Sequence, residues 1–162
     1  MKKILTFITV LIMMLTLVAC SITDNGNIEI NNLSEVLNIE ISQESIVEKK
    51  DTENGFMSMK ITDTKTVEEI KSEWKELPLT ENLTALVYGL EDETSSIGPY
   101  ISEDGEALFP KVENGYYYFY DRHSESKDHF DDTNVLSRHS FNFVIAIFDT
   151  DTNRLYYSKF DT

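Results

Sequence analysis

The feature that most constrains this chain is the arrangement of its first 20 residues. Lys2 and Lys3 precede an almost unbroken apolar run over residues 4–19, and Cys20, the only cysteine among the 162 residues, follows at once. A basic start, an apolar stretch and a site of small residues are the three parts of a secretory signal. An apolar run of about 16 residues is near the lower limit for a membrane-spanning helix, so an uncleaved anchor is the alternative. We therefore expect removal of residues 1–19 and a domain that no internal disulfide stabilises.

The last four residues of this segment, Leu17-Val18-Ala19-Cys20, resemble a bacterial lipobox. The resemblance implies that Cys20 carries a diacylglycerol and becomes the mature N-terminus on the extracytoplasmic face of the cell membrane. Two acyl chains, at about 0.8 kcal/mol per buried methylene, anchor a protein stably. The rest of the chain is similar, in residue usage and size, to small lipoproteins of low-GC Gram-positive bacteria.

Charge narrows the classes of partner. The chain has 14 basic and 29 acidic residues, a formal charge of −15, and removing Lys2 and Lys3 from the basic ones leaves 12 and a charge of −17. Nucleic-acid binding depends on cationic neutralisation of phosphates, so we exclude nucleic acid as a partner. The charge also repels anionic headgroups, which leaves the acyl chains as the attachment to the membrane. Its plainest role is to keep a tethered domain soluble, and cations or basic proteins are the partners it favours.

The remaining chain divides into a tether and one domain. Residues 20–34 are rich in asparagine and poor in apolar residues, which predicts a flexible tether. Residues 35–162 carry the aromatic clusters expected of a packed core and have the length of a single domain.

The first half of the domain has three patterns. Leu37 to Ile41 and Met57 to Ile61 alternate apolar with polar residues, which predicts two strands of an antiparallel hairpin around the turn at residues 49–55. Residues 66–77 have a capping-box start and one apolar stripe, which predict a helix that Pro78 ends and that Trp74 anchors to the core.

The second half contains the most apolar strands. Residues 83–88 are predicted to be a strand, and residues 89–115 to contain one or two short ones. Residues 116–120 and 141–148 are apolar on both faces and are expected at the sheet centre, with a turn at 149–154 and a last strand at 155–160. The predicted fold class is α+β, a mostly antiparallel sheet of five to seven strands with one packed amphipathic helix.

Two segments could hold a metal. The connection from Asp121 to His139 contains all three histidines and several acids, and the candidate ligands are His123, His129, His139 and Asp128. Imidazole with carboxylate suits zinc or another divalent metal, although the spacing matches no metal motif; a solvated, mobile connection is the alternative. Residues 149–153 open like a calcium loop, but Arg154 and Phe160 stand where glycine and glutamate belong, which favours an ordinary turn.

Catalytic patterns are absent from the sequence. It has no Gly-x-Ser-x-Gly elbow and no phosphate-binding glycine loop. We therefore expect a membrane-anchored, non-catalytic binding domain without a cofactor other than the lipid on Cys20, whose partner is an envelope or secreted protein. The alternative is an envelope-associated metal-binding protein or hydrolase that uses the three histidines. A module that binds sugars or peptides would need Tyr116, Tyr118 or Tyr120 exposed beside a cleft.

Overall fold

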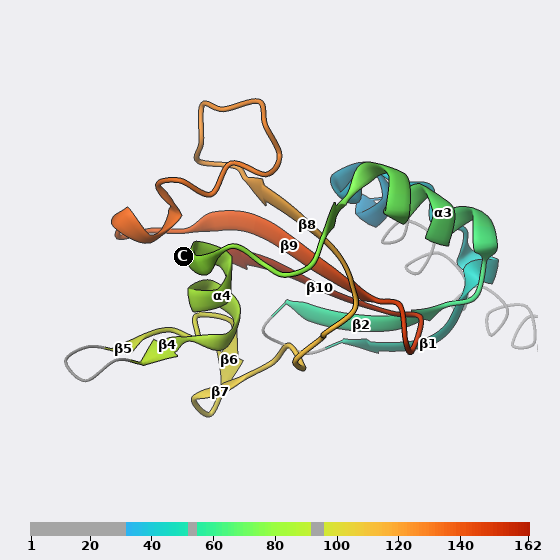
Figure 1. Ribbon diagram of the computed structural model, residues 1–162, viewed down its shortest axis with the longest axis horizontal. Coiled ribbons are helices and arrows are strands. Elements are labelled where there is room, and N and C mark those ends of the chain that lie inside the picture. The colour runs from blue at the N-terminus through green and yellow to red at the C-terminus, as the bar shows by residue number, and fades with distance from the viewer. Residues whose placement is uncertain (1–31, 52–54, 92–95) are drawn as a thin grey trace, which may run out of the picture.

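The computed structural model describes residues 32–51, 55–91 and 96–162 (Figure 1). Residues 32–37 are helical, and the two longer helices are α3 (Thr64–Glu73) and α4 (Glu81–Tyr88). Short 3-10 turns are η1 (Gln43–Ser45) and η2 (Val135–Ser137). The strands are β1 (Ile46–Asp51), β2 (Phe56–Ile61), β3 (Lys75–Glu76), β4 (Leu90–Glu91), β5 (Ser96–Ile97), β6 (Ser102–Glu103), β7 (Glu106–Ala107), β8 (Gly115–Asp121), β9 (Asn142–Asp149) and β10 (Arg154–Asp161).

One antiparallel sheet organises the domain. Its strand order is β1-β2-β10-β9-β8-β3, and the pairs β4-β5 and β6-β7 form two separate small hairpins. The predicted α+β class and strand number are confirmed. β9 lies inside the sheet as expected, whereas β8 pairs with β3 only at Tyr116 and Tyr117, so that no strand of the described residues pairs with the rest of its outer edge.

Side chains of one strand alternate between the two faces of the sheet, and here both faces are buried. Along β9, Val144, Ala146 and Phe148 belong to one core cluster and Phe143, Ile145 and Ile147 to the other. The first cluster lies under α3 and residues 32–37, and we call this side the α3 face. The second includes buried residues of α4, and we call it the α4 face; Figure 1 shows α3 and α4 on opposite sides of the sheet.

Helix α3 is confirmed with shifted ends. Asp63 caps it, because its carboxylate accepts a hydrogen bond of 2.8 Å from the backbone N–H of Thr66. The expected capping residue Thr66 is therefore inside the helix, and Glu69 bonds elsewhere, to the backbone N–H of Glu40 at 3.0 Å. The helix ends before Trp74, since the next two residues pair with β8 as β3.

Trp74 is the predicted core anchor of the α3 face. It is 5% exposed, its ring centroid lies 5.7 Å from that of Tyr118, and its indole N–H donates to the backbone oxygen of Leu37 at 3.4 Å. It thus connects α3, β8 and the 32–37 helix.

The predicted first strand of the hairpin, at residues 37–41, is wrong. β1 pairs with β2 instead, and Leu37, Ile39 and Ile41 lie in the α3-face core outside any strand. Their alternation predicted burial correctly but not pairing. Leu37 ends the 32–37 helix, and Ile39 and Ile41 follow it in an irregular segment packed in the same core. Leu33 is buried as well, so the domain begins before the expected boundary at residue 35, while residues 1–31 are outside the described residues.

The strand predicted at residues 83–88 is also wrong, because the segment is helix α4. The Thr80 hydroxyl accepts from the backbone N–H of Leu83 at 3.2 Å, and Gly89 ends the helix at φ +78°. Leu83, Leu86 and Val87 are all fully buried, the i, i+3, i+4 spacing of a helix face. The loop at 89–115 holds four two-residue strands, more than the one or two expected.

Trp74→Ala is expected to lower the free energy of unfolding by about 3–5 kcal/mol, because it opens a cavity where three elements meet. Circular dichroism during urea unfolding measures the change, since the only tryptophan is lost. The exposed Lys71→Ala on the same helix should stay within about 0.5 kcal/mol of the parent chain. Equal losses in the two variants would contradict the anchoring role of Trp74.

Candidate functional site

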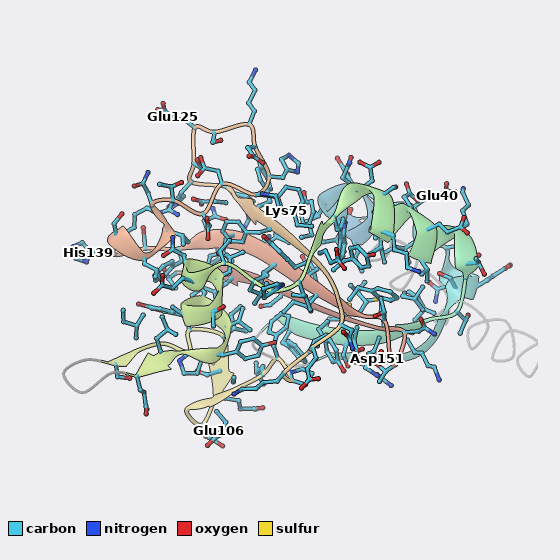
Figure 2. The ribbon with its side chains drawn as sticks, in the orientation of Figure 1. Glu40, Lys75, Glu106, Glu125, His139 and Asp151 are labelled. Carbon is cyan, nitrogen blue, oxygen red and sulfur yellow. The ribbon has the colours of Figure 1, made fainter. Side chains whose placement is uncertain are left out.

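The structure does not bring the candidate metal ligands together. His139 is exposed and points outward at one end of the molecule, far from the loop that carries Glu125 (Figure 2). His123 and Asp128 are exposed, and the Asp128 carboxylate accepts from the backbone N–H of Phe130 at 2.9 Å. Within the described ranges, no three His, Cys, Asp or Glu side chains are grouped as they would be around a metal.

The β8–β9 connection is packed against the domain rather than loosely solvated. Asp121, which is 5% exposed, accepts from Arg138 through both carboxylate oxygens and from the backbone N–H of His123. Val135 of η2 is fully buried in the α4-face core, and Asp132 accepts from the hydroxyl of Thr80. These contacts fix the two ends of the connection.

The middle of the connection covers the open edge of β8. The Phe130 ring lies 6.0 Å from the ring of Tyr117 and 5.8 Å from that of Tyr118, and the Lys75 ammonium lies 4.7 Å from its centroid. Because Tyr117 and Tyr118 point to opposite faces, Phe130 sits across the strand edge and protects it from pairing with another chain.

His129 is placed by two tyrosines of β8. Its Nδ1 lies 2.6 Å from the Tyr118 hydroxyl, and its ring stacks on Tyr120 with centroids 4.4 Å apart. Tyr118 is 3% exposed, which removes its ring as a platform for sugars or peptides, whereas Tyr120 is half-buried. Burial, with a smaller contribution from the Tyr120 phenol, raises the pKa of Tyr118 to about 12.

A pocket of about 740 Å³ adjoins this histidine on the α3 face. The 32–37 helix forms one wall, and β2, β8, β9 and β10 form the floor. The register explains the floor, because Tyr120 lies opposite Val144 and Val144 lies opposite Lys159, all on the same side of the sheet. The apolar and aromatic part of the lining consists of Leu33, Val36, Phe56, Met57, Tyr120, Val144 and Tyr157. Its volume is in the range of small-molecule sites.

Three basic side chains line the same pocket: Arg122, Lys159 and His129. Arg122 donates to Asp161 over a long 3.4 Å, and its Nε is buried without a hydrogen-bond partner in the described part of the chain. The Oδ1 atom of Asn142, on the neighbouring strand, is also buried without a partner there. Burial raises the pKa of Tyr157, and the nearby Arg122 charge opposes that rise. Glu35 is the only acidic residue of the described lining.

His129 also borders a second, smaller pocket of about 230 Å³ that Trp74, Tyr118 and Phe130 line. Its imidazole therefore forms the wall between the two pockets. The sequence singled out His129 for metal binding but missed Arg122 and Lys159. A sequence signal for them does exist. Residues two positions apart in a strand share a face, so Arg122 lies on the same face as Tyr120 and Lys159 on the same face as Tyr157.

The segment at residues 149–153 is the expected turn. The Asp149 carboxylate accepts from the backbone N–H groups of Asp151 at 2.8 Å and Thr152 at 3.3 Å, and from the Thr152 hydroxyl. Asn153 has φ +54°. Asp149 is thus occupied in closing the turn between β9 and β10.

No protein-family model, curated protein or solved structure matches this chain. None of the helices in the described residues combines the length and the hydropathy needed to cross a bilayer.

Arg138→Met is expected to destabilise the domain by about 1–3 kcal/mol, because it leaves the Asp121 carboxylate buried without its cation. Asp121→Asn combined with Arg138→Met should lose less than the sum of the two single changes. Urea unfolding of all four proteins in the cycle gives the coupling energy. A coupling near zero would mean that the pair does not fix the connection.

The raised pKa of Tyr118 predicts a pH dependence of stability. Between about pH 10 and 12 the folded chain keeps the phenol proton that the unfolded chain has lost, so this contribution is complete below pH 10 and disappears as pH rises to 12. The Tyr118 contribution to the decline should amount to about 2–3 kcal/mol by pH 12, about half of it by pH 11, and Tyr118→Phe should lose that much less than the parent chain. Unfolding midpoints of both proteins at pH 9 and 11 test the difference, and identical declines would contradict it.

Proposed function

We propose that this chain is a lipid-anchored, extracytoplasmic binding domain without catalytic activity, and that the 740 Å³ pocket is its binding site. The proposal combines the lipobox-like Leu17-Val18-Ala19-Cys20 with that one structural observation. Cys20 is outside the described residues, so the anchor rests on the sequence alone.

The architecture of the pocket supports binding rather than chemistry. Its floor belongs to the rigid part of the molecule, since it is made by four hydrogen-bonded strands rather than by loops. A few polar groups interrupt a mainly apolar lining, the arrangement that orients a ligand. The one imidazole in its lining, His129, uses Nδ1 for the Tyr118 hydroxyl and stacks its ring on Tyr120, so both contacts hold it in place as part of the wall.

The partner expected from the sequence was an envelope or secreted protein. The size of the pocket suits a small envelope molecule, or one segment of an envelope or secreted protein, as the bound ligand. The alternative, a metal-dependent protein that uses His123, His129 and His139, gains no support from their positions in the structure.

Expression of the full chain in a bacterium that processes lipoproteins tests the anchor. We expect an N-terminal peptide that begins at Cys20 and carries a diacylglycerol mass, and an uncut precursor for Cys20→Ser. Mass spectrometry of membrane fractions gives both results. An unmodified thiol in a processed chain would contradict the proposed location.

The pocket has a test of its own. Val36→Trp should fill it from the half-buried wall of the 32–37 helix. Native mass spectrometry of the domain after incubation with envelope extract should show a bound mass on the parent chain and not on Val36→Trp. The matched control is Val67→Trp, half-buried on α3 outside this pocket. Equal capture by the parent and Val36→Trp would exclude the pocket as the site.

A further inference from the structure

We infer that the 740 Å³ pocket binds a single-chain amphiphile with an anionic headgroup, of the kind that a fatty-acid carboxylate represents. The inference rests on the proposed function, because it names the ligand class of the same site. Shape, charge and position within the chain each support it.

The apolar part of the pocket is continuous. Met57, Tyr157 and Val144 come from three adjacent strands and share the α3 face, and Leu33 and Val36 stand opposite them on the 32–37 helix. A slot between a helix and a sheet suits an alkyl chain. Covering such side chains contributes about 25 cal/mol per Å² of apolar area removed from water.

The cationic groups gather where the strands end. Lys159 lies opposite Val144, and the backbone N–H of Arg122 donates to the backbone oxygen of Asn142, which places Arg122 two positions beyond the Tyr120–Val144 pair. An amphiphile with its alkyl chain over Val144 would therefore bring its headgroup toward Arg122 and Lys159. The anionic headgroup then contacts the cationic side chains, and the alkyl chain contacts the apolar ones.

Arg122 carries the charge argument. Its side chain is 28% exposed and lines the pocket, and its contact with Asp161 is a long one of 3.4 Å through a single terminal nitrogen. The terminal nitrogens can therefore donate to a headgroup oxygen as well. A carboxylate or phosphate oxygen accepts such a bond strongly, because donor and acceptor are both charged.

The position of the pocket favours a membrane source for the ligand. Asn32 lines the pocket about 12 residues after Cys20, a length that spans roughly 20 Å as a flexible coil and at most about 40 Å when extended. With Cys20 acylated, the pocket stays within one domain diameter of the bilayer. Single-chain anions that leave the membrane would therefore meet it at high local concentration.

Titration calorimetry with laurate and dodecyltrimethylammonium tests the inference, since the two probes share a chain length and differ in the sign of charge. The protein is the mature chain, residues 20–162, with Cys20→Ser. We expect one equivalent of laurate to bind, at least about tenfold more tightly than the cationic probe. Acetate and inorganic phosphate should bind far more weakly than laurate. Equal affinity for both dodecyl probes, or for acetate and laurate, would overturn it.

Charge variants locate the headgroup. Lys159→Gln should weaken laurate binding about two- to fivefold and Arg122→Gln about tenfold, whereas Glu35→Gln should strengthen it about twofold. Lys111→Gln, exposed and outside the pocket, is the matched control and should change nothing. Lys159 and Glu35 are exposed, so their variants remain informative if Arg122→Gln fails to fold. Laurate affinity that none of the pocket variants alters would contradict the site.

The two proposals fail in different ways. An acylated Cys20 together with envelope capture that Val36→Trp abolishes, but no selective laurate binding, would keep the binding domain and reject this ligand class. Selective laurate binding by a chain whose Cys20 is never acylated would keep the pocket and its ligand class and reject the lipid-anchored location. Occupation of the pocket by residues 21–31 of the same chain would appear as laurate affinity that rises when those residues are replaced by a glycine–serine segment, and would reject an amphiphile as the resident occupant.

Discussion

Burial of β9 on both faces is the constraint on which the rest of the structure depends. Every residue from Phe143 to Phe148 is at most 1% exposed, which requires a neighbouring strand on each edge and a covering layer on each face. On the α3 face the cover is short: a helix of 10 residues is about 15 Å long, whereas a strand of eight residues spans about 27 Å. One such helix cannot cover the strand. The 32–37 helix covers more of it, and the pocket lies where it borders the strand ends.

The strongly periodic parts of the fold could be predicted because their signals are local. The apolar runs that became β8 and β9, the alternation of β2 and the capped stripe of α3 each indicate their state within a window of about ten residues. The buried Trp74 follows from the same stripe. The centre of the sheet was predictable too, since a run of six apolar residues between turn signals is typical of a strand covered on both faces.

Two predicted strands were wrong because the local sequence pattern is compatible with a second structure. Leu37, Ile39 and Ile41 have the period of a strand, yet β1 takes the place beside β2 and these three side chains cover the sheet from above. Residues 83–88 are rich in β-favouring side chains, but the Thr80 cap and Gly89 at positive φ determine a helix. The pocket was harder still, because Arg122 and Lys159 are 37 positions apart and become neighbours only through the register of three strands.

A cationic pocket is physically consistent with a formal charge of −15, because a bound ligand responds mainly to the charges within a few ångströms of it and much less to the distant charges that make up the net charge. Exposed charges farther apart than a Debye length, about 8 Å at physiological ionic strength, are largely screened from each other. The field inside the pocket is therefore set by the charges in its lining and directly beside it. These are the positive Arg122 and Lys159, the negative Glu35, and the Asp161 carboxylate that lies 3.4 Å from Arg122. Outside it, the net charge repels the anionic surface of a bilayer. The domain would therefore bind single anionic molecules through direct contacts inside the pocket. It would not be drawn to an anionic membrane surface by its overall charge.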